Sequence, residues 1–531
     1  MRRTGLVALA AALLGGGCAA VLGFEDTSVR PGGDDAATPD GARPGDDASV
    51  GSDGAASPSL TLAPPRIAVL RGGSTKATAT LARNGLSGPV TLKASSLPAG
   101  VTMPDGNIAG GADSVELTFT ATAAAVMGPA PDVKIGAAGV PEVAVDLVVS
   151  GPPGALDESF DGDGILSDNV AGNIGVVNAI AIQPDGKLLA GGTGATGNWL
   201  IRRYNADGSA DAVFNTKAGA AQQAGGDVRA IALDPVTQKI IVGGPSLGGT
   251  TTQATIVRLN ADGSADSAFA NSGVTRLDTV GYPNGSTVEG VVVEADSSIV
   301  IAGSKTLAAP LLYSGFVLRL DKKTGAYTSL FMGGERTRLV GVSLEPGKIA
   351  AAGEDGSVAP PGSQIVRVLA GGGPDTTISA TGAFTFLPTC SALGYARRPD
   401  GVYVVTGRDI TGPNFCSGAA VAASGKFLWD FRRGLGNSAQ YTAAAAMADN
   451  RTVIVGYGGG SQDRFALVAR VGVDGKADAT WNGGSAIEFA DPATPDTYIY
   501  QFRSVAIDAL GRIVVGGNKN NAGFTLIRMW P

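Results

Sequence analysis

The chain has no histidine, only three cysteines, and few charged or aromatic residues among its 531 positions. Without imidazole, Ser-His-Asp and Cys-His catalytic arrangements and the common histidine metal sites are excluded. Any chemistry would have to use carboxylate, lysine, tyrosine or cysteine side chains. The sequence therefore assigns no catalytic residue, no metal and no cofactor, and it predicts that the chain is not an enzyme.

Basic residues and long apolar runs are also scarce. Lys and Arg number 40 against 47 Asp and Glu, and no basic stripe stands out, so nucleic acid is not an expected partner. The first apolar run, Leu6 to Leu14, is too short to span a bilayer. It follows Arg2 and Arg3 and leads through small residues into Cys18, which is the pattern of an export signal.

This N-terminal segment resembles a bacterial lipoprotein signal. The resemblance implies that residues 1–17 are removed, that Cys18 carries a lipid, and that the membrane is a partner through that lipid. Gly15 departs from the pattern, which usually has Leu there, so cleavage and secretion without a lipid is the alternative. Ala19 is not the acidic residue that retains some lipoproteins at the inner membrane. We therefore expect a lipid-anchored protein of the cell envelope, in the outer membrane.

Residues 18–58 contain little that could be buried. From Phe24 to Pro58 the chain is mostly Gly, Ala, Pro, Ser and Asp, and it carries most of the net negative charge. Such a composition predicts a disordered, acidic tether that stays extended by self-repulsion.

Residues 59–150 form a different unit. Within Val115–Thr122, apolar and polar residues alternate, which is typical of a strand with one buried face. Similar runs separated by turns favour an immunoglobulin-like β-sandwich, and the segment SSLPAGVT resembles bacterial surface Ig-like modules.

Residues 155–531 contain seven copies of one unit, best seen between Val177 and Phe214. Each copy predicts four short strands, the fourth of the first copy starting beyond Phe214, which favours a propeller blade. The copies are marked by a glycine that closes the second strand and recurs about every 54 residues. These glycines are Gly192, Gly244, Gly303, Gly353, Gly407, Gly456 and Gly517.

An aspartate three residues before a large apolar residue also recurs, as a capped turn followed by a side chain that packs between sheets. The pairs are Asp157 and Phe160, Asp211 and Phe214, Asp266 and Phe269, Asp375 and Ile378, and Asp478 and Trp481. Asp157 and Phe160 precede the first copy, and the last copy lacks its own pair. We therefore predict that Ile165–Asp168 lies beside Phe524–Met529 and closes a seven-bladed, all-β propeller without a free edge.

The pattern of LDESF, VNAIAIQPDGKLLAGG and RYNADGSAD resembles the delta-60 repeat family of bacterial surface proteins. The resemblance covers about Leu156 to Pro531. It implies a β-propeller-like fold and a surface setting, and it carries no catalytic residues.

Cys390 and Cys416 both fall in the fifth copy. In an exported protein an even pair of cysteines is most simply a disulfide, which we predict here. Asp161, Asp163 and Asp168 are of the ligand type that Ca²⁺ takes, but the EF-hand spacing is missing, so a solvated turn is expected.

The leading functional hypothesis is an envelope lipoprotein whose propeller binds an unknown protein or glycan. The long insertions Ser304–Ser314 and Asp491–Tyr500 are candidate contact loops. One alternative is a surface polysaccharide hydrolase or lyase that uses propeller carboxylates, and another is a scaffold for envelope assembly.

Overall fold

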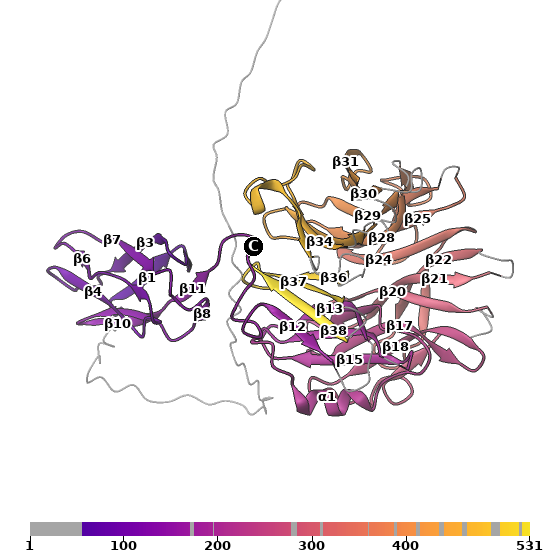
Figure 1. Ribbon diagram of the computed structural model, residues 1–531, viewed down its shortest axis with the longest axis horizontal. Coiled ribbons are helices and arrows are strands. Elements are labelled where there is room, and N and C mark those ends of the chain that lie inside the picture. Colours follow the sequence, from indigo (N-terminus) through magenta and orange to yellow (C-terminus); the bar gives the residue numbers. More distant parts are fainter. Residues whose placement is uncertain are drawn as a thin grey trace, which may run out of the picture. The chain divides into compact units, whose positions relative to one another are not determined.

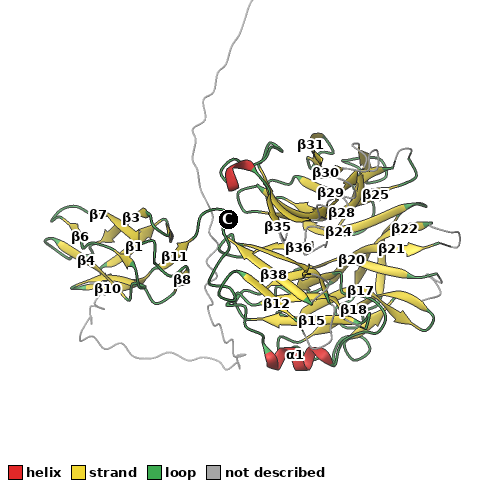
Figure 2. Ribbon diagram, in the orientation of Figure 1, coloured by secondary structure: helices red, strands yellow, loops and turns green. Residues whose placement is uncertain are grey.

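The computed structural model describes residues 56–169, 175–194, 196–277, 284–307, 312–358, 361–386, 390–409, 415–434, 440–458, 465–489, 500–519 and 523–531. Cys18, the predicted signal and most of the predicted tether lie outside these ranges. Almost every described element is a strand (Figure 2). The described helices are α1 (Ala212–Gly219) and the short 3-10 turn η1 (Asn482–Gly484), and no described helix has the length and apolar character needed to cross a membrane.

The N-terminal strands form three small sheets around one apolar core. Their orders are β1-β3-β7-β5, β10-β9-β4-β6 and β2-β11-β8. The predicted alternation is observed in β7, where Leu117, Phe119 and Ala121 are buried. The strands are β1 (Ser59–Ala63), β2 (Arg66–Leu70), β3 (Ser74–Ala82), β4 (Val90–Ser95), β5 (Val101–Thr102), β6 (Gly106–Ile108), β7 (Ser114–Ala121), β8 (Gly128–Ala130), β9 (Lys134–Ala137), β10 (Val140–Ala144) and β11 (Asp146–Ser150).

The remaining described strands form seven antiparallel sheets (Figure 1). Six of these sheets have four strands and one has three. In chain order the strands are β12 (Ile165–Asp168); β13 (Val176–Ile182), β14 (Leu188–Thr193), β15 (Trp199–Tyr204); β16 (Ala230–Leu233), β17 (Ile240–Gly248), β18 (Thr251–Leu259), β19 (Val274–Arg276); β20 (Ser286–Val293), β21 (Ile299–Thr306), β22 (Tyr313–Leu320), β23 (Tyr327–Met332); β24 (Thr337–Glu345), β25 (Lys348–Asp355), β26 (Gly362–Leu369), β27 (Ala383–Phe386); β28 (Cys390–Arg397), β29 (Tyr403–Asp409), β30 (Phe415–Val421), β31 (Phe427–Gly434); β32 (Gln440–Ala446), β33 (Thr452–Gly458), β34 (Phe465–Val471), β35 (Ile487–Phe489); and β36 (Tyr500–Ile507), β37 (Ile513–Lys519), β38 (Phe524–Met529).

The first strands of these sheets follow one another in a closed cycle. Each contacts the next, in the order β13, β16, β20, β24, β28, β32, β36 and back to β13. The last sheet has the order β12-β38-β37-β36, with Ile165 opposite Ile527 and Asp168 opposite Phe524. The prediction that the segment before the first repeat pairs with the end of the last one is therefore confirmed.

The side chain of Asp157 holds this closure. Its carboxylate is fully buried and accepts hydrogen bonds from Arg528 Nε at 2.7 Å and Arg512 Nη1 at 2.9 Å, both in the last sheet. The Arg528 guanidinium also lies 4.7 Å from the centre of the Phe160 ring. One buried carboxylate thus joins residues that are 371 positions apart.

The same pairing of a buried aspartate with an arginine recurs in the repeats. We call this pair the Asp-Arg staple. Asp211 pairs with Arg203 from the third strand and with Lys187 directly before the second, and the Arg203 guanidinium lies 4.1 Å from the centre of the Phe214 ring. Arg203 Nη1 then donates to the carbonyl of Ala261, in the turn after the third strand of the next sheet. The other staple pairs are Asp266 with Arg258, Asp375 with Arg367, and Asp478 with Arg470.

The aspartates also cap their turns, as expected. Burial is the largest single influence on the pKa of Asp211, Asp266, Asp375 and Asp478. For Asp478, burial raises the pKa, but hydrogen bonds from Thr480 and Arg451 and the charge of Arg470 together lower it to about 2. Asp478 is therefore charged at neutral pH. The sequence interpretation missed the arginine, although it stands eight residues before the aspartate in these repeats.

The first repeat differs from the prediction because helix α1 replaces its expected fourth strand. Asp211 Oδ1 accepts from the Phe214 amide and starts the helix. Asn215 then accepts a hydrogen bond from the Arg203 N–H at 2.7 Å and donates one to its carbonyl at 3.2 Å. One amide side chain thus supplies hydrogen bonds to β15 that a neighbouring strand would otherwise make.

The predicted disulfide meets a geometric obstacle. Cys390 in β28 is opposite Asp409, and Cys416 in β30 is opposite Arg408, so strand β29 lies between the two cysteines. Two strand spacings amount to roughly 9.6 Å, whereas a disulfide needs Cα atoms within about 7 Å. This register argues against the bridge; the side chains of both cysteines lie outside the described part of the chain.

Replacing Asp157 by Asn should destabilise the protein by about 3 to 5 kcal/mol, because two buried guanidinium groups would lose their carboxylate. Urea unfolding measures the change. The matched control is Glu158→Gln, which removes an exposed partner of Arg71 and should cost less than about 1 kcal/mol. Equal effects of the two substitutions would show that the buried pair does not hold the closure.

Candidate functional site at the mouth of the central cavity

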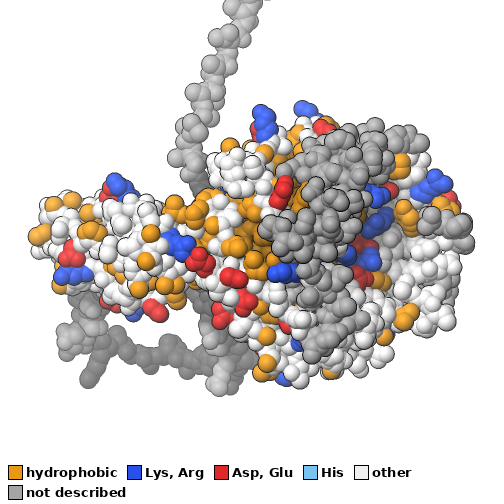
Figure 3. All heavy atoms as spheres, viewed as in Figure 1, with side chains coloured by type: hydrophobic (Ala, Val, Ile, Leu, Met, Phe, Trp, Pro, Cys, Tyr) orange, Lys and Arg blue, Asp and Glu red, His pale blue; other side chains and the backbone are white. Residues whose placement is uncertain are grey.

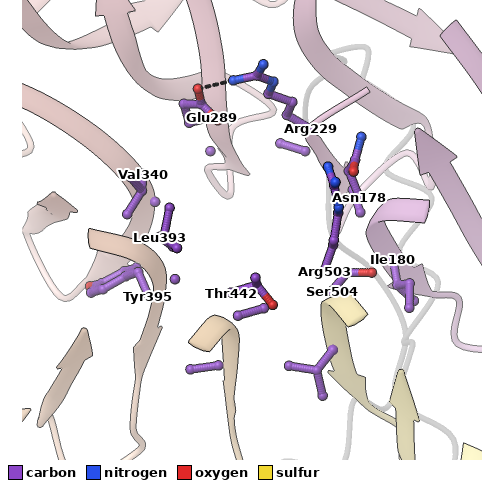
Figure 4. A pocket seen from close by; sticks show the side chains of 18 of the residues that line it. Asn178, Ile180, Arg229, Glu289, Val340, Leu393, Tyr395, Thr442, Arg503 and Ser504 are labelled. Carbon is purple, nitrogen blue, oxygen red and sulfur yellow. Dashed lines mark hydrogen bonds and ion pairs between the residues drawn. The ribbon is translucent and has the colours of Figure 1, made fainter. Parts of the chain in front are cut away.

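A cavity of about 480 Å³ lies where the seven first strands meet. Residues from β13, β20, β24, β28, β32 and β36, and residues in and just before β16, line it (Figure 4). The cavity therefore draws one set of side chains from every repeat.

In six of the seven first strands, a β-bulge turns one side chain into this cavity. In β20, for example, Val288 pairs with Gly303 and Gly290 with Ala302, so Glu289 between them has no partner in the ladder. Arg229, directly before β16, takes the equivalent place in the second repeat, where its amide bonds to Gly243. We call these seven residues the mouth ring: Asn178, Arg229, Glu289, Val340, Leu393, Thr442 and Arg503.

The repeat glycines exist because of these bulges. A Cβ on Gly303 would lie 2.0 Å from the carbonyl oxygen of Thr287, two residues before Glu289. A Cβ on any of the other six glycines would likewise lie 1.7 to 2.1 Å from a carbonyl oxygen. The pairs of glycine and carbonyl are Gly192 with Val176, Gly244 with Asp227, Gly353 with Arg338, Gly407 with Ser391, Gly456 with Gln440, and Gly517 with Gln501. The periodic glycine thus marks the backbone that places a mouth-ring side chain.

The mouth ring is polar on one arc and apolar on another. Arg503, Asn178, Arg229 and Glu289 come from consecutive repeats, whereas Val340 and Leu393 face them across the opening (Figure 4). Two positions further along each strand, the lining is mostly apolar, with Ile180, Ile231, Val291, Val342, Tyr395, Ala444 and Val505. A polar opening therefore leads to a largely apolar wall.

Arg229 organises the charges of the polar arc. Its guanidinium contacts Glu289 Oε1 at 2.5 Å and Asp227 Oδ1 at 3.2 Å, and Asn178 Nδ2 donates to Asp227 Oδ2 at 3.0 Å. Burial lowers the pKa of Arg229, but the charges of Glu289 and Asp227 outweigh it and raise that pKa above its usual value. Two carboxylates from neighbouring repeats are thus held beside one cation at the cavity.

The candidates named from the sequence lie elsewhere. Residues 304–306 and 313–314 and Tyr500 of the predicted contact loops lie in strands, whereas residues 308–311 and 491–499 of these loops are outside the described residues. Asp168 accepts from the Tyr204 hydroxyl and Asp163 from the Ile165 amide, so each has its own partner. No described group of three or more Asp, Glu or Cys side chains is placed to hold a metal ion.

The sequence interpretation missed the mouth ring. Its members stand 13 to 15 residues before each repeat glycine, in otherwise alternating strands, and the seven positions hold six different residue types. The glycine was a usable signal, because it points to a close backbone approach.

On the face drawn in Figure 3, acidic and basic side chains are intermixed.

Comparisons with known proteins support a propeller-like repeat fold. Residues 183–214 and 239–269 match the family model described as a domain of unknown function (DUF5122) beta-propeller. No curated protein matches the sequence. The chain is an all-β, propeller-like repeat protein.

Similar solved structures include two glycosidases and an oxygenase. A Penicillium chrysogenum α-L-arabinanase is 11% identical, with a TM-score of 0.35 over 57% of this chain and 93% of its own. A Fusarium graminearum α-L-arabinofuranosidase is 10% identical, with a TM-score of 0.33 over 57% and 92%. A Synechocystis apocarotenoid oxygenase is 9% identical, with a TM-score of 0.32 over 84% and 90%. At these values the likeness concerns the fold alone.

The prediction that the chain is not an enzyme is corrected here, because the similar structures include glycosidases. That prediction gave too much weight to the missing histidine. Glycoside hydrolysis uses carboxylates, which the absence of imidazole leaves untouched.

Replacing Gly303 by Ala should destabilise the third sheet by about 3 kcal/mol or more, since the new methyl group meets a backbone oxygen that cannot move alone. Thermal unfolding measures the effect. Gly334→Ala is the matched control, because a Cβ there has no atom within 4 Å. A Gly303 variant as stable as the control would contradict the assignment of the glycines to the bulges.

Proposed function

We propose that the mouth ring is a glycan-processing site and that Asp227 and Glu289 form its acid-base pair. The observation that carries the proposal is the placement of both carboxylates against Arg229 at the cavity. Paired carboxylates flanking one bond are what most glycoside hydrolases require. The reaction proposed is hydrolysis of a polysaccharide.

The other lining groups suit a sugar. Asn178, Gln440 and Thr442 offer amide and hydroxyl groups, which can both donate to and accept from sugar hydroxyls. The apolar wall below the polar arc supports the packing of sugar C–H faces. Polar groups that fix orientation above an apolar lining are typical of small-molecule sites.

Glu289→Gln and Asp227→Asn should each lower turnover at least about 100-fold, because each removes a group able to transfer a proton. The assay measures new reducing ends on a panel of neutral and acidic polysaccharides. The matched control is Glu294→Gln in the same sheet, which also loses an ion pair, with Arg319, but lies outside the cavity lining. Thermal unfolding checks that all three variants fold.

Two results would contradict this function. One is a wild-type protein that cleaves no polysaccharide of the panel. The other is turnover that falls no further in the two cavity variants than in the Glu294 variant.

We also propose the setting of this site. The seven sheets are the blades of a seven-bladed propeller of delta-60-type repeats (155–531), and residues 59–150 form an Ig-like module beyond the 18–58 tether. Lipidation of Cys18 would hold the chain in the outer membrane, where polysaccharide is within reach. The closed cycle of first strands supports the blade count, and the signal-like segment supports the anchor.

Cys18→Ser should abolish incorporation of labelled palmitate in the producing cells and release the protein from the membrane fraction. Cys390→Ser is the control and should retain the label. Equal labelling of the two variants would rule out the proposed anchor.

A further inference from the structure

Arg503 differs from the other cation of the mouth ring. Arg229 contacts two carboxylates, whereas the described contacts of Arg503 include no ion pair, and its side chain has only a 3.4 Å hydrogen bond to Gln501 Oε1. Arg503 is also the exposed member of the ring, the other six being half-buried. It lines the cavity near Asn178 (Figure 4). A guanidinium group is thus presented at the opening without a carboxylate to neutralise it.

The order of the mouth ring places this cation away from the carboxylates. Asn178 and Arg229 stand between Arg503 and Glu289 along the polar arc. Arg229 neutralises one of the two negative charges of Asp227 and Glu289, and the amide of Asn178, which donates to Asp227, lies between that pair and Arg503. The arc therefore has one end suited to an anion and another suited to acid-base chemistry.

We propose that Arg503 forms a subsite for the carboxylate of a uronic acid, so that the glycan taken by this site is acidic. This inference rests on the proposed function and adds the class of sugar to it. The planar guanidinium matches a carboxylate with two parallel hydrogen bonds, a geometry that lysine cannot reproduce.

The test compares binding of two trisaccharides of the same linkage, one of galacturonate and one of galactose, by titration calorimetry. The wild type should bind the acidic sugar about ten-fold more tightly, as expected for a hydrogen-bonded charge pair. Arg503→Gln should abolish this preference, so that the two sugars bind with similar affinity. Arg503→Lys should keep only part of it, and the control Arg66→Gln, outside the cavity lining, should keep all of it.

Three outcomes would overturn the inference: equal binding of the two sugars by the wild type, an unchanged preference in Arg503→Gln, or binding of neither sugar. Failure of the proposed hydrolysis is separate from these results. If Glu289→Gln and Asp227→Asn leave turnover unaffected while Arg503→Gln loses the preference, the hydrolytic assignment fails and the carboxylate subsite stands.

Discussion

The buried carboxylate of Asp157 between Arg512 and Arg528 is the contact on which the rest of the structure depends. Four other sheets pack through the same kind of staple, but here the aspartate comes from the start of the repeat region and the arginines from its end. Because β12 completes the last sheet, β36 can pack against β13 and the first strands close their cycle. A cavity shared by all seven repeats exists only when that cycle is closed.

The backbone at the repeat glycines links the packing of the sheets to the candidate site. At each repeat glycine a backbone carbonyl oxygen comes so close that a Cβ could not fit, and this backbone arrangement directs one residue into the cavity. The repeats therefore share one backbone geometry, while the side chain at the mouth-ring position differs from repeat to repeat. At this position Arg229, Glu289 and Arg503 place charges in the cavity, whereas Val340 and Leu393 keep the opposite side apolar.

Much of the fold could be predicted from the sequence, because it rests on local patterns. The alternation around Phe119, the repeated hairpins and the incomplete last repeat gave the strands and the pairing of β12 with β38. Helix α1 could not be foreseen, since it depends on Asn215 replacing strand hydrogen bonds across the sheet edge.

The site was much less predictable. Asp227 and Glu289 are 62 residues apart and meet because β16 contacts β20, so their pairing by Arg229 leaves no local trace. The strand register that places β29 between Cys390 and Cys416 could not be read from the sequence either. The central claim is tested most directly by hydrogen exchange of the amides in β12 and β38. Closure by the staple predicts that both strands exchange with the same high protection and that both lose it together in Asp157→Asn; fast exchange of β12 alone in the wild type would contradict it.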